Sequence, residues 1–370
     1  MDIFHLLHLA KSKGASDLHL IVSRPPMLRI DGSLLAGNGS PLTPEDIDQA
    51  FTQLSSERQR EDFGNRLELD FGYTLPDVGR LRCNVAKQRG TVSIAIRLLP
   101  PVIPTVDELN LPAVCKELVL RPRGLVVVTG PTGSGKSTTL AAMINHLNSK
   151  ERRRVVTIED PIEYVYSDMR CTIIQREIGS DTLSFAEALR HILRQDPDVI
   201  LVGEMRDLET ASAVLTIAET GHLVLTTGHA PSASQAIDRV IDLFPPHERH
   251  LAESRLAFLI IGVLCQTLVP RANTSGRVPA VEIMLATSAV RNLIREGKTY
   301  QLPNIIRMHA REGMQLLDQA LINLYLERLI SHESLMAFCN DQNEVTKVIG
   351  EAKQSNLGLA AVANSYLEEQ

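Results

Sequence analysis

An α/β fold built on a parallel sheet is predicted for most of this 370-residue chain by three observations. Continuous apolar runs rich in β-branched residues recur, the first being GLVVVTG at residues 124–130. Stretches with a helical spacing of apolar residues separate these runs. A glycine-rich segment directly follows the first run and opens a helix at 136–147. Strands that are buried on both faces and alternate with helices are typical of a parallel sheet with helices on both sides.

The same alternation continues along the chain. Further strands are predicted at 155–158, 199–202 and 223–225, and further helices at 185–194, 208–218 and 234–241. From about residue 285 onward only helical periodicity is found, which predicts helices at 288–296, 315–329 and 334–339. Residues 351–370 are small and polar, so we expect a flexible tail there.

A smaller α+β domain is predicted for residues 1–99. A helix over 3–13 ends near Gly14, and another opens at Thr43. Short strands are predicted at 18–22, 27–30, 67–73 and 80–88, the last pairing with TVSIAIRLL across a turn at Gly90. Apolar residues alternate along that hairpin, as in a half-buried antiparallel sheet. Prolines at 100, 101 and 104 then predict a stiff linker over 100–111.

Composition narrows the class of protein. The 38 basic and 44 acidic residues give a net charge of −6, so nothing in the overall charge favours nucleic-acid binding. No two of the five cysteines lie within four residues of each other, which argues against a zinc finger and favours reduced thiols. No apolar run approaches the roughly 18 residues of a membrane helix, and the N-terminus lacks the basic start of a signal peptide. We therefore expect a cytoplasmic protein.

The strongest functional signal is GPTGSGKST at residues 130–138. It fits G-x-x-x-x-G-K-[ST] between an apolar strand and a helix, the context that a phosphate-binding P-loop requires. Glycines let the backbone wrap a phosphate chain, whose charge the N–H groups at a helix start stabilise. Lys136 is predicted to reach the β- and γ-phosphates of ATP, and Ser137 to ligate Mg²⁺. The predicted nucleotide-binding residues are Gly130, Thr132, Gly133, Ser134, Gly135, Lys136, Ser137 and Thr138.

Two acidic segments follow predicted strands. DVILVGEMRD at 198–207 places Glu204 at a strand end, where ligands bind in open α/β sheets. Many nucleotide hydrolases have Asp where Gly203 stands here, so Glu204 is expected either to meet Mg²⁺ through water or to orient the attacking water. TIEDPIEY at 157–164 brings Glu163 as an alternative base and Glu159 as a second carboxylate for metal-bound water. Each segment also has a purely structural alternative: Glu204 is then a carboxylate at a helix start, and TIEDPIEY is a solvated acidic turn.

Histidine and arginine supply the remaining candidates. TGHLVLTTGH at 220–229 ends at His229, which suits donation to a phosphate oxygen or signalling across an interface, unless it is structural. The hairpin before the linker carries Arg80, Arg82, Arg89 and Arg97. Arg82 or Arg97 is predicted to clamp the γ-phosphate in the manner of an arginine finger. The alternative is a solvated basic sheet face.

Taken together and in this order, the motifs resemble the secretion-type ATPase superfamily, and within it the PilT-type retraction ATPases of type IV pili. AVRNLIREGK at 289–298 resembles the family's C-terminal segment linked to retraction. The resemblance runs from SDLHL at 16–20 to about residue 350. It implies a PAS-like N-terminal domain at 1–99, a Pro-rich linker at 100–111, a RecA-like ATPase domain at 112–285 and a C-terminal helical segment at 286–350.

The resemblance also implies an activity and partners. It implies a homo-hexamer that couples ATP hydrolysis to pilus retraction and twitching motility, at the inner-membrane base of the pilus machine beside a platform protein. A paralogous pilus ATPase is a further expected partner, and nucleic acid is not one. Extension-type members carry an additional N-terminal domain and usually a four-cysteine metal site, which are not found here. The alternatives are an accessory or extension-type secretion ATPase, a RecA-like nucleic-acid motor and a regulatory nucleotide-binding module. A larger apolar residue usually stands where Gly228 is, which leaves the role of His229 open.

Overall fold

The structure, a computed structural model, describes residues 1–30, 32–99 and 102–350. Two of the predicted linker prolines and the predicted tail lie outside these residues. The chain divides into two compact units, Met1–Ile103 together with Val156–Ala188, and Pro104–Val155 together with the remainder from Leu189 onward. Each unit is described by itself below. Within the described ranges, no helix is long and apolar enough to cross a membrane.

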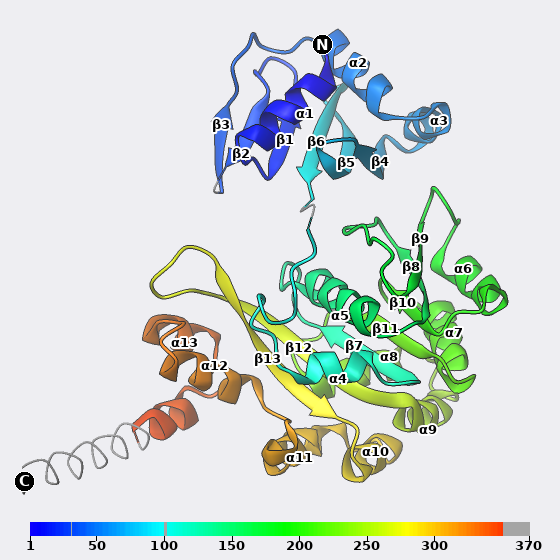
Figure 1. The fold of residues 1–370 in the computed structure, drawn as a ribbon, viewed down its shortest axis with the longest axis vertical. Coiled ribbons are helices and arrows are strands. Elements are labelled where there is room, and N and C mark those ends of the chain that lie inside the picture. Colours follow the sequence, from blue (N-terminus) through cyan, green and yellow to red (C-terminus); the bar gives the residue numbers. More distant parts are fainter. Residues whose placement is uncertain (31, 100–101, 351–370) are drawn as a thin grey trace, which may run out of the picture. The chain divides into compact units, whose positions relative to one another are not determined.

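The N-terminal part contains a six-stranded antiparallel sheet with the order β3-β2-β1-β6-β5-β4 (Figure 1). The strands are β1 (Asp17–Leu20), β2 (Met27–Ile30), β3 (Ser33–Ala36), β4 (Glu68–Leu75), β5 (Gly79–Gln88) and β6 (Thr91–Leu98). The helices are α1 (Ile3–Ser12), α2 (Pro44–Leu54) and α3 (Glu57–Arg66). The hairpin predicted across Gly90 is confirmed as β5–β6, since Gln88 pairs with Thr91.

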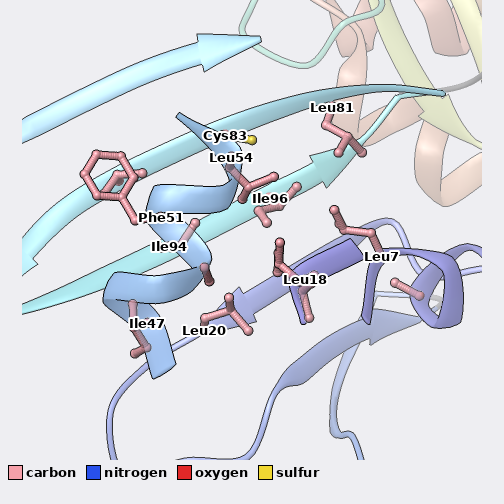
Figure 2. Close-up of a cluster of buried hydrophobic side chains, with 14 of the residues drawn as sticks. Leu7, Leu18, Leu20, Ile47, Phe51, Leu54, Leu81, Cys83, Ile94 and Ile96 are labelled. Carbon is pink, nitrogen blue, oxygen red and sulfur yellow. The ribbon is translucent and has the colours of Figure 1, made fainter. Parts of the chain in front are cut away.

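One face of this sheet is covered by α1 and α2. In Figure 2 the labelled side chains of α1 (Leu7) and α2 (Phe51, Leu54) lie on the same side of the sheet as Leu18, Leu81 and Ile96, and all belong to one buried cluster. The alternation of apolar residues in β5 and β6 sends every second side chain into this core and leaves the others on the opposite face. That opposite face carries the polar and charged residues of the hairpin.

Helix α2 begins as its sequence predicts. Thr43 accepts a hydrogen bond from the backbone N–H of Asp46, and the Asp46 carboxylate accepts one from the backbone N–H of Thr43. This reciprocal capping satisfies two backbone donors that a helix start otherwise leaves open. Helix α3 was not predicted, because Phe63 is its only buried residue and no apolar period marks it. Strand β3 was missed for a similar reason, since all four of its residues are exposed.

The second sheet has seven strands in the order β13-β12-β7-β11-β10-β8-β9. The strands are β7 (Gly124–Thr129), β8 (Arg154–Glu159), β9 (Thr172–Glu177), β10 (Val199–Val202), β11 (Leu223–Thr227), β12 (Ile260–Pro270) and β13 (Arg277–Leu285). The helices up to β12 are α4 (Val114–Val119), α5 (Lys136–Lys150), α6 (Phe185–Ile192), α7 (Leu208–Glu219), α8 (Ala233–Asp242) and α9 (Arg249–Leu259). Strands β7, β10 and β11 are parallel and wholly buried, which confirms the predicted core of the sheet.

One edge of the predicted parallel sheet carries an antiparallel strand that the sequence did not indicate. β12 runs parallel to β7, but it turns back into β13 as an antiparallel hairpin whose pairs run from Gly262–Leu285 to Pro270–Arg277. The sequence shows only one apolar run across residues 256–268, and that run contains the end of α9 as well as β12. Periodicity cannot separate a buried helix end from a buried strand in such a run.

The chain ends in helices packed beside this hairpin. They are α10 (Ser288–Arg295), α11 (Leu302–Met308), α12 (Leu317–Leu326) and α13 (His332–Phe338). A buried acid, Glu282 of β13, joins them to the sheet: its carboxylate accepts hydrogen bonds from the backbone N–H of Ala233, at the start of α8, at 2.7 Å and of Leu317, at the start of α12, at 3.3 Å. One carboxylate thus satisfies a backbone donor at the start of each of two helices.

Candidate nucleotide-binding site

The glycine-rich loop joins strand β7 to helix α5, whose first residue is Lys136. Its backbone has φ of +141° at Gly130, +77° at Gly133 and +88° at Gly135, angles that only glycine adopts readily. The loop curls over the ammonium of Lys136, whose Nζ donates to the carbonyl oxygens of Gly130 at 2.9 Å and Pro131 at 3.1 Å. A lysine and the N–H groups of a helix start are gathered at one place, an arrangement that binds anions.

Two further features of the loop fit a phosphate chain. Ser134 is 2% exposed, and its hydroxyl has no hydrogen-bond partner within the described part of the chain. A buried hydroxyl without a partner is costly, and a phosphate oxygen would provide one. No atom lies within 4 Å of the place where a side chain at Gly133 would begin, so the tip of the loop is open. Ser137 and Thr138 follow in the first turn of α5, and Thr132 is exposed on the loop.

A pocket of about 340 Å³ opens beside the start of α5. Its walls combine apolar side chains with three charged ones. They are Glu108, Leu109, Leu111, Gly135, Thr138, Thr139, Gln266, Leu268, Arg271, Gly276, Arg277 and Pro279. The pocket shares Gly135 and Thr138 with the loop. A ring attached to a phosphate chain could therefore occupy the pocket while the phosphates lie on the loop.

Glu204 and His229 come together at the ends of neighbouring strands. Glu204 follows β10, and its Oε1 lies 3.1 Å from Nε2 of His229, which follows β11. The other oxygen, Oε2, lies 2.7 Å from Nη2 of Arg206. The Thr227 hydroxyl donates to the carbonyl oxygen of Gly203, so the two loops are fastened to each other one residue before the acid and two before the histidine.

A second pocket, of about 350 Å³, lies beside this pair. Glu204 and His229 both line it, together with Thr129 at the end of β7 and with Arg206 and Arg239. The sequence analysis missed the two arginines. Arg206 carried a signal, since it stands two residues after Glu204, whereas Arg239 lies on α8 and only the fold brings it to this pocket.

The acidic segment TIEDPIEY belongs to the other compact unit. Oε1 of Glu159 accepts hydrogen bonds from the Thr157 hydroxyl at 2.6 Å and from Nε2 of Gln175 at 3.2 Å. Burial raises the pKa of Glu159 to about 7, and the neighbouring charge of Glu163 adds to this effect while the two hydrogen bonds oppose it. The two hydrogen bonds from Thr157 and Gln175 thus occupy Oε1 of Glu159. Glu163 is half-buried beside it.

The hairpin arginines have different surroundings. Nε of Arg97 lies 2.9 Å from Oδ1 of Asp17, a buried acid on β1. Arg82 stands directly opposite Arg97 in the pairing of β5 with β6. Arg80 forms an ion pair with Glu177, which also accepts a hydrogen bond from the backbone N–H of Gly72. Asp17 and Glu177 lie far along the chain from their partners, and no sequence motif marks these pairs.

Side chains suited to bind a resident metal do not cluster in the resolved ranges: no group of three or more His, Cys, Asp or Glu is arranged to hold one there. A parallel sheet whose buried strand β7 ends in G-x-x-x-x-G-K-S, with a carboxylate at the end of β10, defines a P-loop ATPase. Comparison with known families agrees. The chain belongs to the type II/IV secretion system protein family, whose model matches residues 92–346.

Several characterised proteins are similar over nearly their whole length. The Pseudomonas aeruginosa "type IV pilus retractation ATPase PilT" is 47% identical over 90% of this chain and 97% of its own. The type IV pilus ATPase PilU of the same species is 38% identical over 96% of this chain and 93% of its own. A crystal structure of the pilus retraction motor PilT with bound ADP superimposes with a TM-score of 0.87 at 42% identity, covering 94% of this chain and 99% of that one.

Proposed function

We propose that this protein is a motor ATPase that drives the retraction of type IV pili. The observation that carries the proposal is the near-complete overlap with the retraction ATPase PilT in both sequence and fold, which extends over the N-terminal sheet as well as the P-loop unit. An activity on pili is thereby favoured over that of a lone nucleotide-binding module. The closed P-loop around Lys136 supports turnover of a nucleoside triphosphate.

The phosphate chain is proposed to lie on the loop from Gly130 to Thr138, with Lys136 turning from its own loop carbonyls to the β- and γ-phosphates. The pocket bounded by Leu268 and Arg277 would take the base and sugar. Ser137, at the start of α5, would hold Mg²⁺, with Glu204 and Glu159 contributing through water at most. When bound, Mg²⁺ neutralises charge on the β- and γ-phosphates.

Glu204 is proposed to orient the attacking water. Its two oxygens already accept from His229 and Arg206, which fixes the carboxylate in one direction. A carboxylate held in this way is well placed to orient a water molecule. Glu163 is kept as the alternative general base. The role of His229 follows from its contact: it holds Glu204 rather than standing alone.

Arg82 is the better candidate for the γ-phosphate clamp. Arg97 is already paired with the buried Asp17, and withdrawing it would leave that acid with only the Ser16 hydroxyl and the more distant Arg29, 3.9 Å away. Weakening the pairing of a buried charge is destabilising. Arg82 lies on the same sheet face, opposite Arg97 in the pairing of β5 with β6, and is not one of the arginines that pair with Asp17. Both arginines remain proposals for catalysis.

The working form is proposed to be a cytoplasmic homo-hexamer at the inner-membrane base of the pilus machine, in contact with a platform protein. The similarity to PilU favours a paralogous pilus ATPase as a functional partner. The proposal is tested by measuring ATPase activity beside the mass from size-exclusion chromatography, with and without nucleotide. In cells, deletion of the gene is expected to leave excess pili without twitching. Cells without pili would indicate an extension ATPase instead, and salt-dependent DNA binding would indicate a nucleic-acid motor.

A further inference from the structure

A glutamine on β12, outside every nucleotide-binding motif, is fastened to the glycine-rich loop. Gln266 is 3% exposed, and both ends of its amide are used. Nε2 donates to the carbonyl oxygen of Ser134 at 2.7 Å, and Oε1 accepts from the hydroxyl of Thr139 on α5 at 2.7 Å. We propose that Gln266 is a positioning residue for phosphate binding, which aims the backbone N–H of Gly135 at the bound phosphates. The inference rests on the proposed assignment of the loop to phosphate binding.

The direction of the Gly135 N–H follows from the planarity of the peptide bond that joins Ser134 to Gly135. In a trans peptide the C=O of one residue and the N–H of the next point in opposite directions. The carbonyl of Ser134 points at Gln266, behind the loop. The N–H of Gly135 must then point away from β12, into the concave side where Lys136 lies. Phosphate binding by a P-loop depends on such inward N–H groups, because each one donates to an anionic oxygen.

The Ser134 carbonyl, which can only accept, decides which way the amide of Gln266 faces, and Thr139 pairs with the other end of the amide. A glutamine amide can rotate to exchange its oxygen and its nitrogen, and only one orientation donates to Ser134. The hydroxyl of Thr139 donates to Oε1, and Thr139 is 1% exposed, so this contact is shielded from water. A flipped amide would place its nitrogen against the Thr139 hydroxyl and its oxygen against the Ser134 carbonyl. Two acceptors facing each other repel, so the observed orientation is favoured.

The same glutamine explains why the loop has glycine at both ends of its motif. A Cβ at Gly130 would stand 2.2 Å from the main-chain oxygen of Gln266, and a Cβ at Gly135 would stand 2.8 Å from its Nε2. Both distances are shorter than atoms tolerate. Strand register brings this about, because Cys265 pairs with Thr129 and Gln266 is therefore next to the first loop residue. The loop and β12 are fitted to each other.

The test compares Gln266→Leu with a matched control in the full-length protein. Leu fills a similar volume but cannot donate to Ser134. Gln315→Leu is the control, because the Gln315 amide also donates to a backbone carbonyl, that of Val281. Val281 pairs with Gln266 in the β12–β13 hairpin, so the control removes a bond in the same part of the sheet but none to Ser134. Binding of a fluorescent ADP analogue, thermal stability, and kcat and KM for ATP are measured for each. Gln266→Leu is expected to weaken ADP binding about tenfold, the loss typical of one good hydrogen bond.

The kinetic signature separates positioning from general damage. The N–H of Gly135 would meet the phosphates in the ground state and the transition state alike, so KM is expected to rise about tenfold while kcat changes little. Gln315→Leu should leave both constants near wild type. Unchanged ADP binding in a folded Gln266→Leu protein, or equal losses in both variants, would overturn the inference.

A double variant covers the case in which Gln266→Leu is merely unstable. In Thr139→Val/Gln266→Leu an apolar pair replaces the buried polar pair, while the Ser134 carbonyl still lacks its donor. Part of the lost stability is therefore expected to return while ADP binding stays weak. Recovery of binding together with stability would overturn the positioning role. Lys136→Ala tests the underlying assignment separately. Normal ADP and ATP binding by that variant would remove the loop from the site, whereas loss in Lys136→Ala with normal binding in Gln266→Leu would reject only the glutamine.

Discussion

His229 and Glu204 form a bonded pair across two neighbouring parallel strands, with Nε2 of the histidine 3.1 Å from Oε1 of the acid. The strands β10 and β11 are in register, Val202 opposite Thr226, so the pair stands where both strands leave the sheet. The direction of the carboxylate therefore depends on the histidine. Any function of Glu204 that depends on the orientation of its carboxylate therefore depends on His229 as well.

His229→Ala is expected to lower kcat about a hundredfold, because a catalytic group that moves by about 1 Å loses rate on that scale. ATP binding should persist, since the loop around Lys136 does not touch the ring. Glu204→Gln/His229→Ala should be no slower than Glu204→Gln alone, because the histidine acts through the acid. Steady-state ATPase rates of the three variants provide the measurement, and additive losses would show that His229 acts independently.

Glu204→Gln is expected to retain ATP binding and to lose hydrolysis by about 10²–10⁴-fold, the usual contribution of a positioned acid–base group. Glu163→Gln is the companion variant. If Glu163→Gln loses the rate while Glu204→Gln keeps it, the general base is Glu163 and Glu204 has only an accessory role. Single-turnover hydrolysis of bound ATP distinguishes the two outcomes, because it removes product release from the measured rate.

Arg82→Ala is expected to slow ATP hydrolysis about a hundredfold or more while ADP affinity changes little, because the γ-phosphate is present only in ATP. Arg89→Ala, at the exposed turn of the same hairpin, is the matched control for charge loss. Arg97→Ala should differ from both by lowering thermal stability, since it removes the nearer of the two arginines that pair with the buried Asp17. Unchanged turnover in Arg82→Ala, Arg97→Ala and their combination would leave the N-terminal sheet as a scaffold.

Asp17→Asn is expected to destabilise the protein by about 2 kcal/mol at neutral pH, the order of a hydrogen bond to a charged group. Burial by itself would raise the pKa of Asp17, but hydrogen bonds from Ser16 and Arg97 and the charge of Arg97 lower it below the ordinary value. A carboxylate with a lowered pKa stabilises the fold above its unfolded pKa, near 4, and loses that contribution as pH falls through its folded pKa. The difference in unfolding free energy between Asp17→Asn and wild type should therefore shrink toward pH 3.

Urea unfolding at pH 7 and pH 3 measures this difference. Asp48→Asn, on the exposed side of α2, is the control for removal of a surface carboxylate. A pH-independent deficit in Asp17→Asn would mean that the side chain contributes through packing rather than charge.

Leu293→Ala is expected to impair pilus retraction while most of the ATPase rate remains. Val290 and Ile294 of α10 are buried, whereas Leu293 is only half-buried at its edge. Arg291 serves as a contrasting position, because its guanidinium donates to the carbonyl oxygens of Ala257 and Phe258 at the end of α9. Arg291→Ala should cost stability and both activities. Twitching-zone diameter beside ATPase rate separates the variants, and parallel loss in Leu293→Ala would place that residue in the core.

The parts of the molecule that could be predicted from sequence are those whose signal is local. Strand β7, the glycine loop and helix α5 follow one another in the chain, so period, glycine and lysine appear in a single stretch. The contacts that hold the site together are not local. Gln266 meets Ser134 across 132 residues, and Arg80 meets Glu177 across 97. Only the register of strands decides such pairs, and a single sequence does not state the register.

Histidine illustrates the same limit within the site. TGHLVLTTGH marks His229 as notable, but the partner of its ring depends on β10 and β11 being adjacent, which chain order does not imply. Arg239 has no local signal, because nothing in α8 distinguishes an arginine that lines a pocket from one that faces water. Residues that serve the site through the fold therefore escape sequence reasoning more often than those that belong to a motif.

The buried carboxylate of Glu282 has a mechanical consequence. One oxygen accepts a hydrogen bond from the first turn of α8, which follows the loop that carries His229. The other accepts one from the first turn of α12, which belongs to the C-terminal helices. Neither helix can move along its axis without straining or breaking its hydrogen bond to this buried carboxylate. Glu282 thus ties the start of α8, four residues after His229, to the start of α12 among the C-terminal helices. The positions of these two helices therefore depend on each other through one side chain.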